Sequence, residues 1–171
     1  MFRKLAGTIA LVWAFGASEV AQAGVKTNSV PGTDFSKYTT YRWKVAAGPG
    51  APDLDRQLRA AAEEQLAKEG LKKVAGDGEA ADLEIAYNAG TVDILVAGID
   101  VVAGWWGDLI GVPGTDSNVT GGLMYVFNDA ATGQVVWTGL IVKRGTTVNA
   151  AQVMKKRAPK WAKQILAAYT D

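Results

Sequence analysis

Hydrophobic and polar positions alternate along four stretches of the chain. In residues 38–45, Tyr41, Trp43 and Val45 fall on one side and Arg42 and Lys44 on the other. Alternation of period two with aromatic and β-branched residues predicts a strand that buries one face. The same reasoning predicts strands at residues 82–88, 119–128 and 135–143. A turn at residues 129–133 joins the last two strands into a hairpin.

Two other stretches have the three-to-four-residue period of a helix that buries one side. In residues 53–69 the apolar positions are Leu54, Leu58, Ala61, Ala62 and Leu66. Asp53 is expected to cap this helix at its start and Gly70 to stop it. A final helix is expected from Asn149 onward, with Met154, Ala158, Trp161, Ile165 and Ala168 facing inward. Pro159 lies inside this second pattern and is expected to kink or split the helix.

The remaining segments have weaker patterns. Residues 24–33 are polar and are expected to be irregular, residues 91–102 are expected to form a β-ribbon, and residues 104–118 read as a loop rich in glycine and proline. The predicted element order is β-α-β-(β-ribbon)-β-β-α. This order predicts an α+β domain whose mainly antiparallel sheet carries two helices packed on one face.

Residues 1–23 have the anatomy of a secretory signal peptide. A basic start at Arg3 and Lys4 precedes an apolar run, and Ala21-Gln22-Ala23 is a small-x-small cleavage site. We therefore expect cleavage before Gly24, one domain over residues 24–171, and a periplasmic or secreted location. No transmembrane anchor is expected, because the apolar segment 92–112 contains three aspartates, each costing about 2.5–3.5 kcal/mol at a bilayer centre.

Composition excludes several kinds of chemistry. The sequence has no histidine and no cysteine. Ser-His-Asp and Cys-His catalysis and zinc sites built on His or Cys are therefore absent, and no metal or cofactor is expected. Without Arg3, Lys4 and Glu19 of the leader, the charges of the chain balance to zero. Nucleic acid is therefore not an expected partner, because it needs a strong positive excess.

Four landmarks together resemble a family of bacterial envelope proteins, domain-of-unknown-function family 4136. They are residues 34–43 (DFSKYTTYRW), the helix from Leu54-Asp55 to residues 68–71 (KEGL), residues 81–87 (ADLEIAY), and the hairpin from Gly122-Leu123 through residues 129–133 (DAATG) to residues 135–139 (VVWTG). The resemblance implies an α+β fold and an envelope location, and it supplies no catalytic residues. Members are often lipoproteins anchored through a cysteine after the cleavage site. Gly24 stands at that place, so no lipid anchor is expected.

Trp105 and Trp106 are the first candidate binding residues. Two adjacent indoles cannot both face the same side of a strand, so at least one is a candidate for exposure. Exposed tryptophan suits contact with a protein, a glycan or a membrane surface. The alternative is that both indoles cover the sheet or its edge.

A basic patch on the final helix is the second candidate. Its members are Lys155, Lys156, Arg157, Lys160 and Lys163. Such a patch suits anionic lipid headgroups or polyanions, and the alternative is a solvated outer face.

Catalysis without histidine or cysteine would depend on carboxylate, lysine or tyrosine chemistry, and carboxylate pairs are the candidates considered. The closest pairs are Asp53/Asp55 and Asp82/Glu84, but the first pair begins a helix and the second lies on the outward side of a strand. The sequence therefore favours a non-enzymatic envelope protein that binds or assembles through the Gly/Trp-rich segment. The alternative is a carboxylate-based hydrolase acting on envelope glycans.

Overall fold

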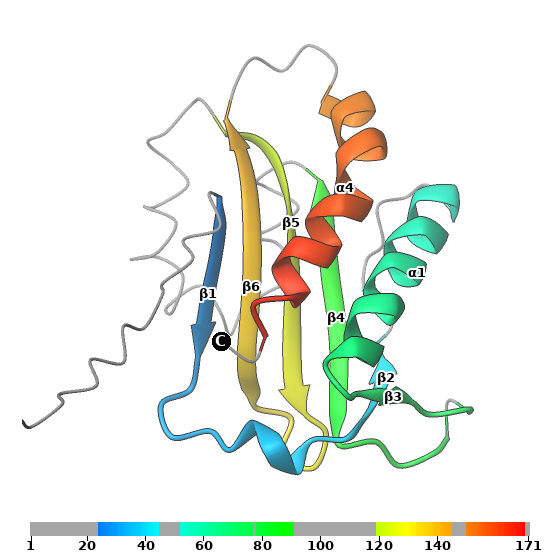
Figure 1. The fold of residues 1–171 in the computed structure, drawn as a ribbon, viewed down its shortest axis with the longest axis vertical. Coiled ribbons are helices and arrows are strands. Elements are labelled where there is room, and N and C mark those ends of the chain that lie inside the picture. Colours follow the sequence, from blue (N-terminus) through cyan, green and yellow to red (C-terminus); the bar gives the residue numbers. More distant parts are fainter. Residues whose placement is uncertain (1–23, 45–51, 77, 91–118, 145–149, 170–171) are drawn as a thin grey trace, which may run out of the picture.

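The computed structural model describes residues 24–44, 52–76, 78–90, 119–144 and 150–169 (Figure 1). This part of the chain forms one six-stranded sheet with two helices in front of it. The strands are β1 (Val25–Ser29), β2 (Thr40–Trp43), β3 (Lys72–Lys73), β4 (Leu83–Gly90), β5 (Val119–Asp129) and β6 (Val135–Arg144). The helices are α1 (Pro52–Lys68), α4 (Ala150–Leu166) and a 3-10 turn, η1 (Phe35–Lys37).

The sheet order is β1-β6-β5-β4-β2-β3, and the sheet is mixed. The pairs β1–β6, β6–β5 and β5–β4 are antiparallel, which confirms the predicted hairpin and the α+β class. The pairs β2–β4 and β2–β3 are parallel. Parallel pairing follows from the helix α1 between these strands, because a helical crossover returns the chain in the same direction.

Helix α1 begins one residue earlier than the sequence predicted. Pro52 is its first residue, a position where the missing N–H of proline costs nothing. Asp53 therefore lies in the first turn and is not the cap. At the other end the backbone of Gly70 has a φ of 84°, and the N–H of Leu71 donates to the carbonyl of Leu66 over 2.9 Å. This is the glycine-terminated helix end that the sequence predicted.

Helix α4 runs without a break through Pro159, so the predicted split does not occur. Its inner residues Ala158, Trp161 and Ile165 are buried, as their spacing predicted. The strand residues below are Trp137 and Gly139 of β6 with Tyr125 and Phe127 of β5. A Cβ on Gly139 would lie 2.4 Å from side-chain atoms of both Ile165 and Trp137, so the helix rests directly on this glycine.

The centre of the sheet is withdrawn from water on both faces. Residues that alternate with the helix-facing ones, including Met124, Thr138 and Leu140, are also buried. The exposed backbone of the sheet is therefore at its edges. One correction concerns an edge strand: residues 25–29, expected to be irregular, form β1 and pair with β6.

Several predictions fall outside the described residues. They are the signal peptide at 1–23, the β-ribbon at 91–102, the loop at 104–118 and the cap at Asn149. Neither described helix combines the length and apolar character that a membrane span requires.

Candidate functional site

Strand β1 forms one edge of the sheet and has backbone groups without a partner strand. The N–H of Val30 donates to the carbonyl of Val136, and the hydroxyl of Thr138 donates to the carbonyl of Asn28. The backbone N–H and C=O groups of successive residues point alternately to the two sides of an antiparallel strand. Those of Lys26 and Asn28 therefore point toward β6, on the same side as the N–H of Val30. The N–H and C=O of Val25, Thr27 and Ser29 consequently point away from β6, and within the described chain no strand pairs with them.

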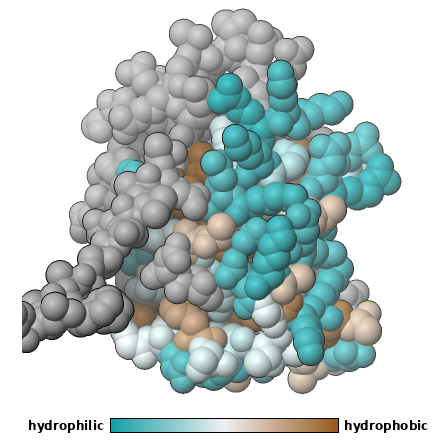
Figure 2. Space-filling view, in the orientation of Figure 1, coloured by the Kyte–Doolittle hydropathy of each residue, from teal (hydrophilic) through white to brown (hydrophobic). Residues whose placement is uncertain are grey.

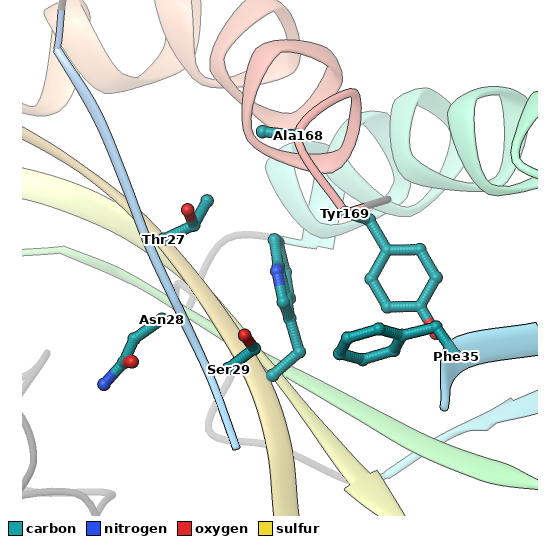
Figure 3. Close-up of a pocket in the computed structure, with 7 residues that line it drawn as sticks. Thr27, Asn28, Ser29, Phe35, Ala168 and Tyr169 are labelled. Atoms are coloured by element: carbon teal, nitrogen blue, oxygen red, sulfur yellow. The ribbon is translucent and has the colours of Figure 1, made fainter. Parts of the chain in front are cut away.

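A pocket of about 230 Å³ lies beside this edge, on the helix side of the sheet. Thr27 and Ser29 pair with Gly139 and Trp137 of β6, so their side chains share the face that α4 covers. Figure 3 shows Thr27, Asn28 and Ser29 on one side of the pocket, Phe35 and Tyr169 on the other, and Ala168 at the end of the helix. The volume is below the roughly 300–1,000 Å³ of typical small-molecule sites, so it suits a single side chain.

Packed aromatic rings form the far wall of the pocket. The ring centroid of Tyr169 lies 5.2 Å from that of Phe35, 4.8 Å from that of Phe127 and 5.5 Å from that of Trp137. Trp137 and Phe127 are themselves 4.8 Å apart. Rings at these distances in tilted and edge-on arrangements attract one another beyond simple burial. The wall is thus held in place before any ligand arrives.

The lining of the pocket carries no charged side chain. The hydroxyl of Tyr169 is buried without a hydrogen-bond partner among the described residues. Burial, followed by the nearby Tyr38, raises the pKa of Tyr169 well above its ordinary value, so this hydroxyl stays neutral. An uncharged side chain is therefore the group that the pocket accommodates best.

The sequence-predicted candidates lie elsewhere. Trp105 and Trp106 are outside the described residues. The basic patch is on the outer surface of α4, where Lys155, Lys156, Arg157 and Lys160 are exposed and Lys163 is half-buried. Trp137 is in the core with 2% exposure, as the alternation of residues 135–143 predicts for its face of the strand, and it also lines the pocket.

The four carboxylates considered for catalysis are bound within the fold. Asp53 pairs with Arg56, and Asp55 accepts from Arg59 and from the hydroxyl of Tyr87. Asp82 accepts four hydrogen bonds from Thr39 and Thr40, two from backbone N–H groups and two from hydroxyls, at 2.8–3.0 Å. The backbone N–H of Thr39 is the main cause of the lowered pKa of Asp82.

Glu84 is held from the neighbouring strand. It pairs with Arg42 at 2.5 Å and with Lys44 at 3.5 Å. The Arg42 hydrogen bond is the main reason that the pKa of Glu84 lies below its ordinary value. Each of the four carboxylates, Asp53, Asp55, Asp82 and Glu84, thus forms a hydrogen bond or an ion pair within the fold. None of them is among the residues that line the pocket beside β1.

Sequence reasoning missed β1, Phe35 and Tyr169 as parts of one site. A weak indication was present, because Val25, Thr27 and Ser29 alternate with Lys26 and Asn28. Among residues 25–29 only Val25 has an apolar side chain, so this short pattern does not distinguish a strand from a polar loop. The pocket itself joins residues from both ends of the domain, which no local pattern reveals.

The described residues form a two-layer α+β domain in which no described strand pairs with the outer side of β1. The chain belongs to the family described as Domain of unknown function (DUF4136), whose model matches residues 25–169. No curated protein matches the chain. The family places no activity on any of the residues above.

Two solved structures are similar to the chain at low identity. A PDZ domain protein from Parabacteroides distasonis is 13% identical with a TM-score of 0.56, and the match covers 85% of this chain and 35% of that one. The PelC dodecamer from Paraburkholderia phytofirmans is 14% identical with a TM-score of 0.47, covering 84% of this chain and 94% of that one. The first likeness shows the fold alone, and the second is too weak to support a conclusion.

Proposed function

We propose that this protein is a non-catalytic binding or assembly module of the cell envelope that takes an extended segment of a partner protein on the free edge of β1. The observation that carries the proposal is the backbone of Val25, Thr27 and Ser29, which no described strand pairs, beside a pocket whose described lining is uncharged. Strand addition obtains affinity from backbone hydrogen bonds and specificity from pockets for alternate side chains. The envelope location rests on the signal-peptide pattern of residues 1–23.

The pocket lies where an added strand would place a side chain. An added strand alternates its side chains between the two faces, as β1 does. Every second residue of the partner would therefore point toward the helix side, next to Thr27 and Ser29. One of these residues, with a neutral and preferably apolar side chain, would enter the pocket between Phe35, Trp137 and Tyr169.

Proline at Thr27 tests the edge directly. Proline lacks the N–H, and the N–H of Thr27 points to the free edge, so Thr27→Pro removes one docking group without removing a bond to β6. Thr27→Val keeps the N–H and is the matched control. Asn28→Pro removes the backbone N–H that points toward β6, so it should destabilise the fold. This loss would verify that the N–H groups of Thr27 and Asn28 point to opposite sides of β1.

The probe is a displayed library of short random peptides selected on the immobilised protein. We expect selected peptides with alternating polarity and an apolar residue, which bind wild type and Thr27→Val and lose binding to Thr27→Pro. Circular dichroism and thermal melting check that Thr27→Pro is folded. Peptides that bind a folded Thr27→Pro protein as well as wild type would refute strand addition, as would a selection that yields no binder.

The Gly/Trp-rich segment is a second contact that the sequence predicts. Replacing Trp105 and Trp106 with alanine should change the free energy of unfolding by about 1 kcal/mol or less and weaken capture of envelope components by the protein. A loss of several kcal/mol in stability with capture intact would instead identify these indoles as core.

A further inference from the structure

The outer surface of helix α4 is basic over residues 155–163. The sequence of the helix, Ala150–Leu166, contains no aspartate or glutamate. Its five cations all fall between residues 155 and 163. Lys155, Lys156, Arg157 and Lys160 are exposed, and Lys163 is half-buried.

The cations form a ridge opposite the buried side of the helix. At 100° per residue, Lys156, Lys160 and Lys163 project within about 60° of one another, away from the buried Trp161 and Ile165. Lys155 and Arg157 flank this line. The ridge extends about 12 Å along the helix at a rise of about 1.5 Å per residue. Figure 2 shows hydrophilic side chains covering this side of the molecule.

On the neighbouring helix α1, basic side chains form ion pairs with acidic side chains of the same helix. On α1, Asp53 pairs with Arg56, Asp55 with Arg59 at 3.1 Å, and Glu64 with Lys68 at 3.1 Å. On α4, Lys163 pairs with Glu64 of α1 at 2.5 Å. For Lys155, Lys156, Arg157 and Lys160, no described acid lies within ion-pair distance. The four cations therefore form an uncompensated positive surface in a chain of almost no net charge.

We propose that this ridge docks the protein on a lipid surface that carries anionic headgroups. Each Lys or Arg near such a surface adds to the attraction, and several in a row are needed for measurable binding. Lysine predominates on the ridge, and it acts as a flexible point charge suited to mobile headgroups and not to one fixed ligand. Between residues 155 and 163 the outward line has no large apolar side chain, so this part of the helix lies on the headgroups without insertion.

Sedimentation with vesicles tests the proposal on the full exported protein. The protein should bind vesicles of phosphatidylethanolamine and phosphatidylglycerol, should not bind phosphatidylcholine vesicles, and should dissociate as salt rises. Lys156→Gln with Lys160→Gln should weaken binding about 30-fold, since each cation contributes roughly fivefold. Glutamine is a good helix former, so the variant should keep its fold, which thermal melting verifies.

The matched control removes two positive charges elsewhere. Lys37 in η1 and Lys44 after β2 are exposed, and their replacement by glutamine gives the same net charge. Binding should then change little, because charges beyond a Debye length of about 10 Å at 0.1 M salt are screened. Three results would overturn the proposal: equal losses in both variants, equal binding to both kinds of vesicle, or binding to soluble heparin with none to vesicles.

Discussion

The two edges of the sheet are built in opposite ways. At one edge β3 is two residues long, and both are exposed lysines, Lys72 and Lys73. Short length and lysine are devices by which proteins prevent strands from adding to an edge. At the other edge β1 has five residues, and the three whose backbone groups point away from β6, Val25, Thr27 and Ser29, have uncharged side chains. The difference indicates that β3 is guarded and β1 is open.

The side-chain contacts that stabilise the two edges also differ. Around β1, the rings of Phe35, Trp137 and Tyr169 pack together. Around β2, the rings of Tyr41, Trp43 and Tyr87 also pack together, but polar contacts are added to them. Asp82 accepts hydrogen bonds from Thr39 and Thr40, and Asp129 at the end of β5 accepts one from the hydroxyl of Tyr38 at 2.9 Å. The described lining of the pocket beside β1 carries no charge, whereas the contacts around β2 depend on the charged carboxylate of Asp82.

The largest effect should come from removing the aromatic wall at the β1 edge. Trp137→Ala should lower the free energy of unfolding by about 3–5 kcal/mol, because it leaves a cavity against Phe127 and Tyr169. Urea unfolding followed by circular dichroism measures this loss. An unchanged midpoint would show that the aromatic packing contributes little at this edge.

A smaller loss is expected from removing the polar clamp at the opposite edge. Asp82→Ala deletes the acceptor of four hydrogen bonds from Thr39 and Thr40 and should cost about 1–3 kcal/mol. Asp34→Ala is the control, since this exposed carboxylate bonds only with Ser36. Equal losses in the two variants would argue against a special role for the Asp82 clamp.

Acid should weaken the hydrogen bonds that Asp82 and Asp129 accept. Hydrogen bonds from Thr39 and Thr40 lower the pKa of Asp82, and those from Thr132 and then Tyr38 lower the pKa of Asp129. An unfolded Asp titrates near pH 3.9, so these carboxylates contribute fully above that pH and lose their contribution as the pH falls below it. The melting temperature should therefore fall below about pH 4. Asp129→Asn should make this decline shallower, and an unaltered slope would contradict the assignment.

The smallest effect on stability should come from removing the guard at β3. Lys72→Thr with Lys73→Thr should change the free energy of unfolding by about 0.5 kcal/mol or less, because both side chains are exposed, although Lys73 loses its pair with Glu63. The variant should nevertheless self-associate at high concentration, which analytical ultracentrifugation detects. A monomer at every concentration would mean that the length of β3, and not its lysines, guards this edge.

Most of the elements could be predicted from local patterns. The periods of two and of three to four residues located β2, β4, β5, β6, α1 and α4 within a few residues, and Gly70 marked the end of α1. These features depend on neighbours in the chain, such as the buried stripe of Leu54, Leu58 and Leu66. The burial of Trp137 followed in the same way from its place in an alternating strand.

The candidate site could not be predicted, because it has no local pattern. The sequence by itself determined the alternation of polarity, the stripes that bury each helix, and the absence of histidine and cysteine chemistry. Only the tertiary structure decided that residues 25–29 pair with β6, that β2 and β4 run parallel, and that Tyr169 meets Phe35 and Trp137. The physical reason is that strand pairing and ring packing join residues far apart in the sequence, from 32 positions for Trp137 and Tyr169 to 134 for Phe35 and Tyr169, and their free energy is gained only when the whole sheet forms.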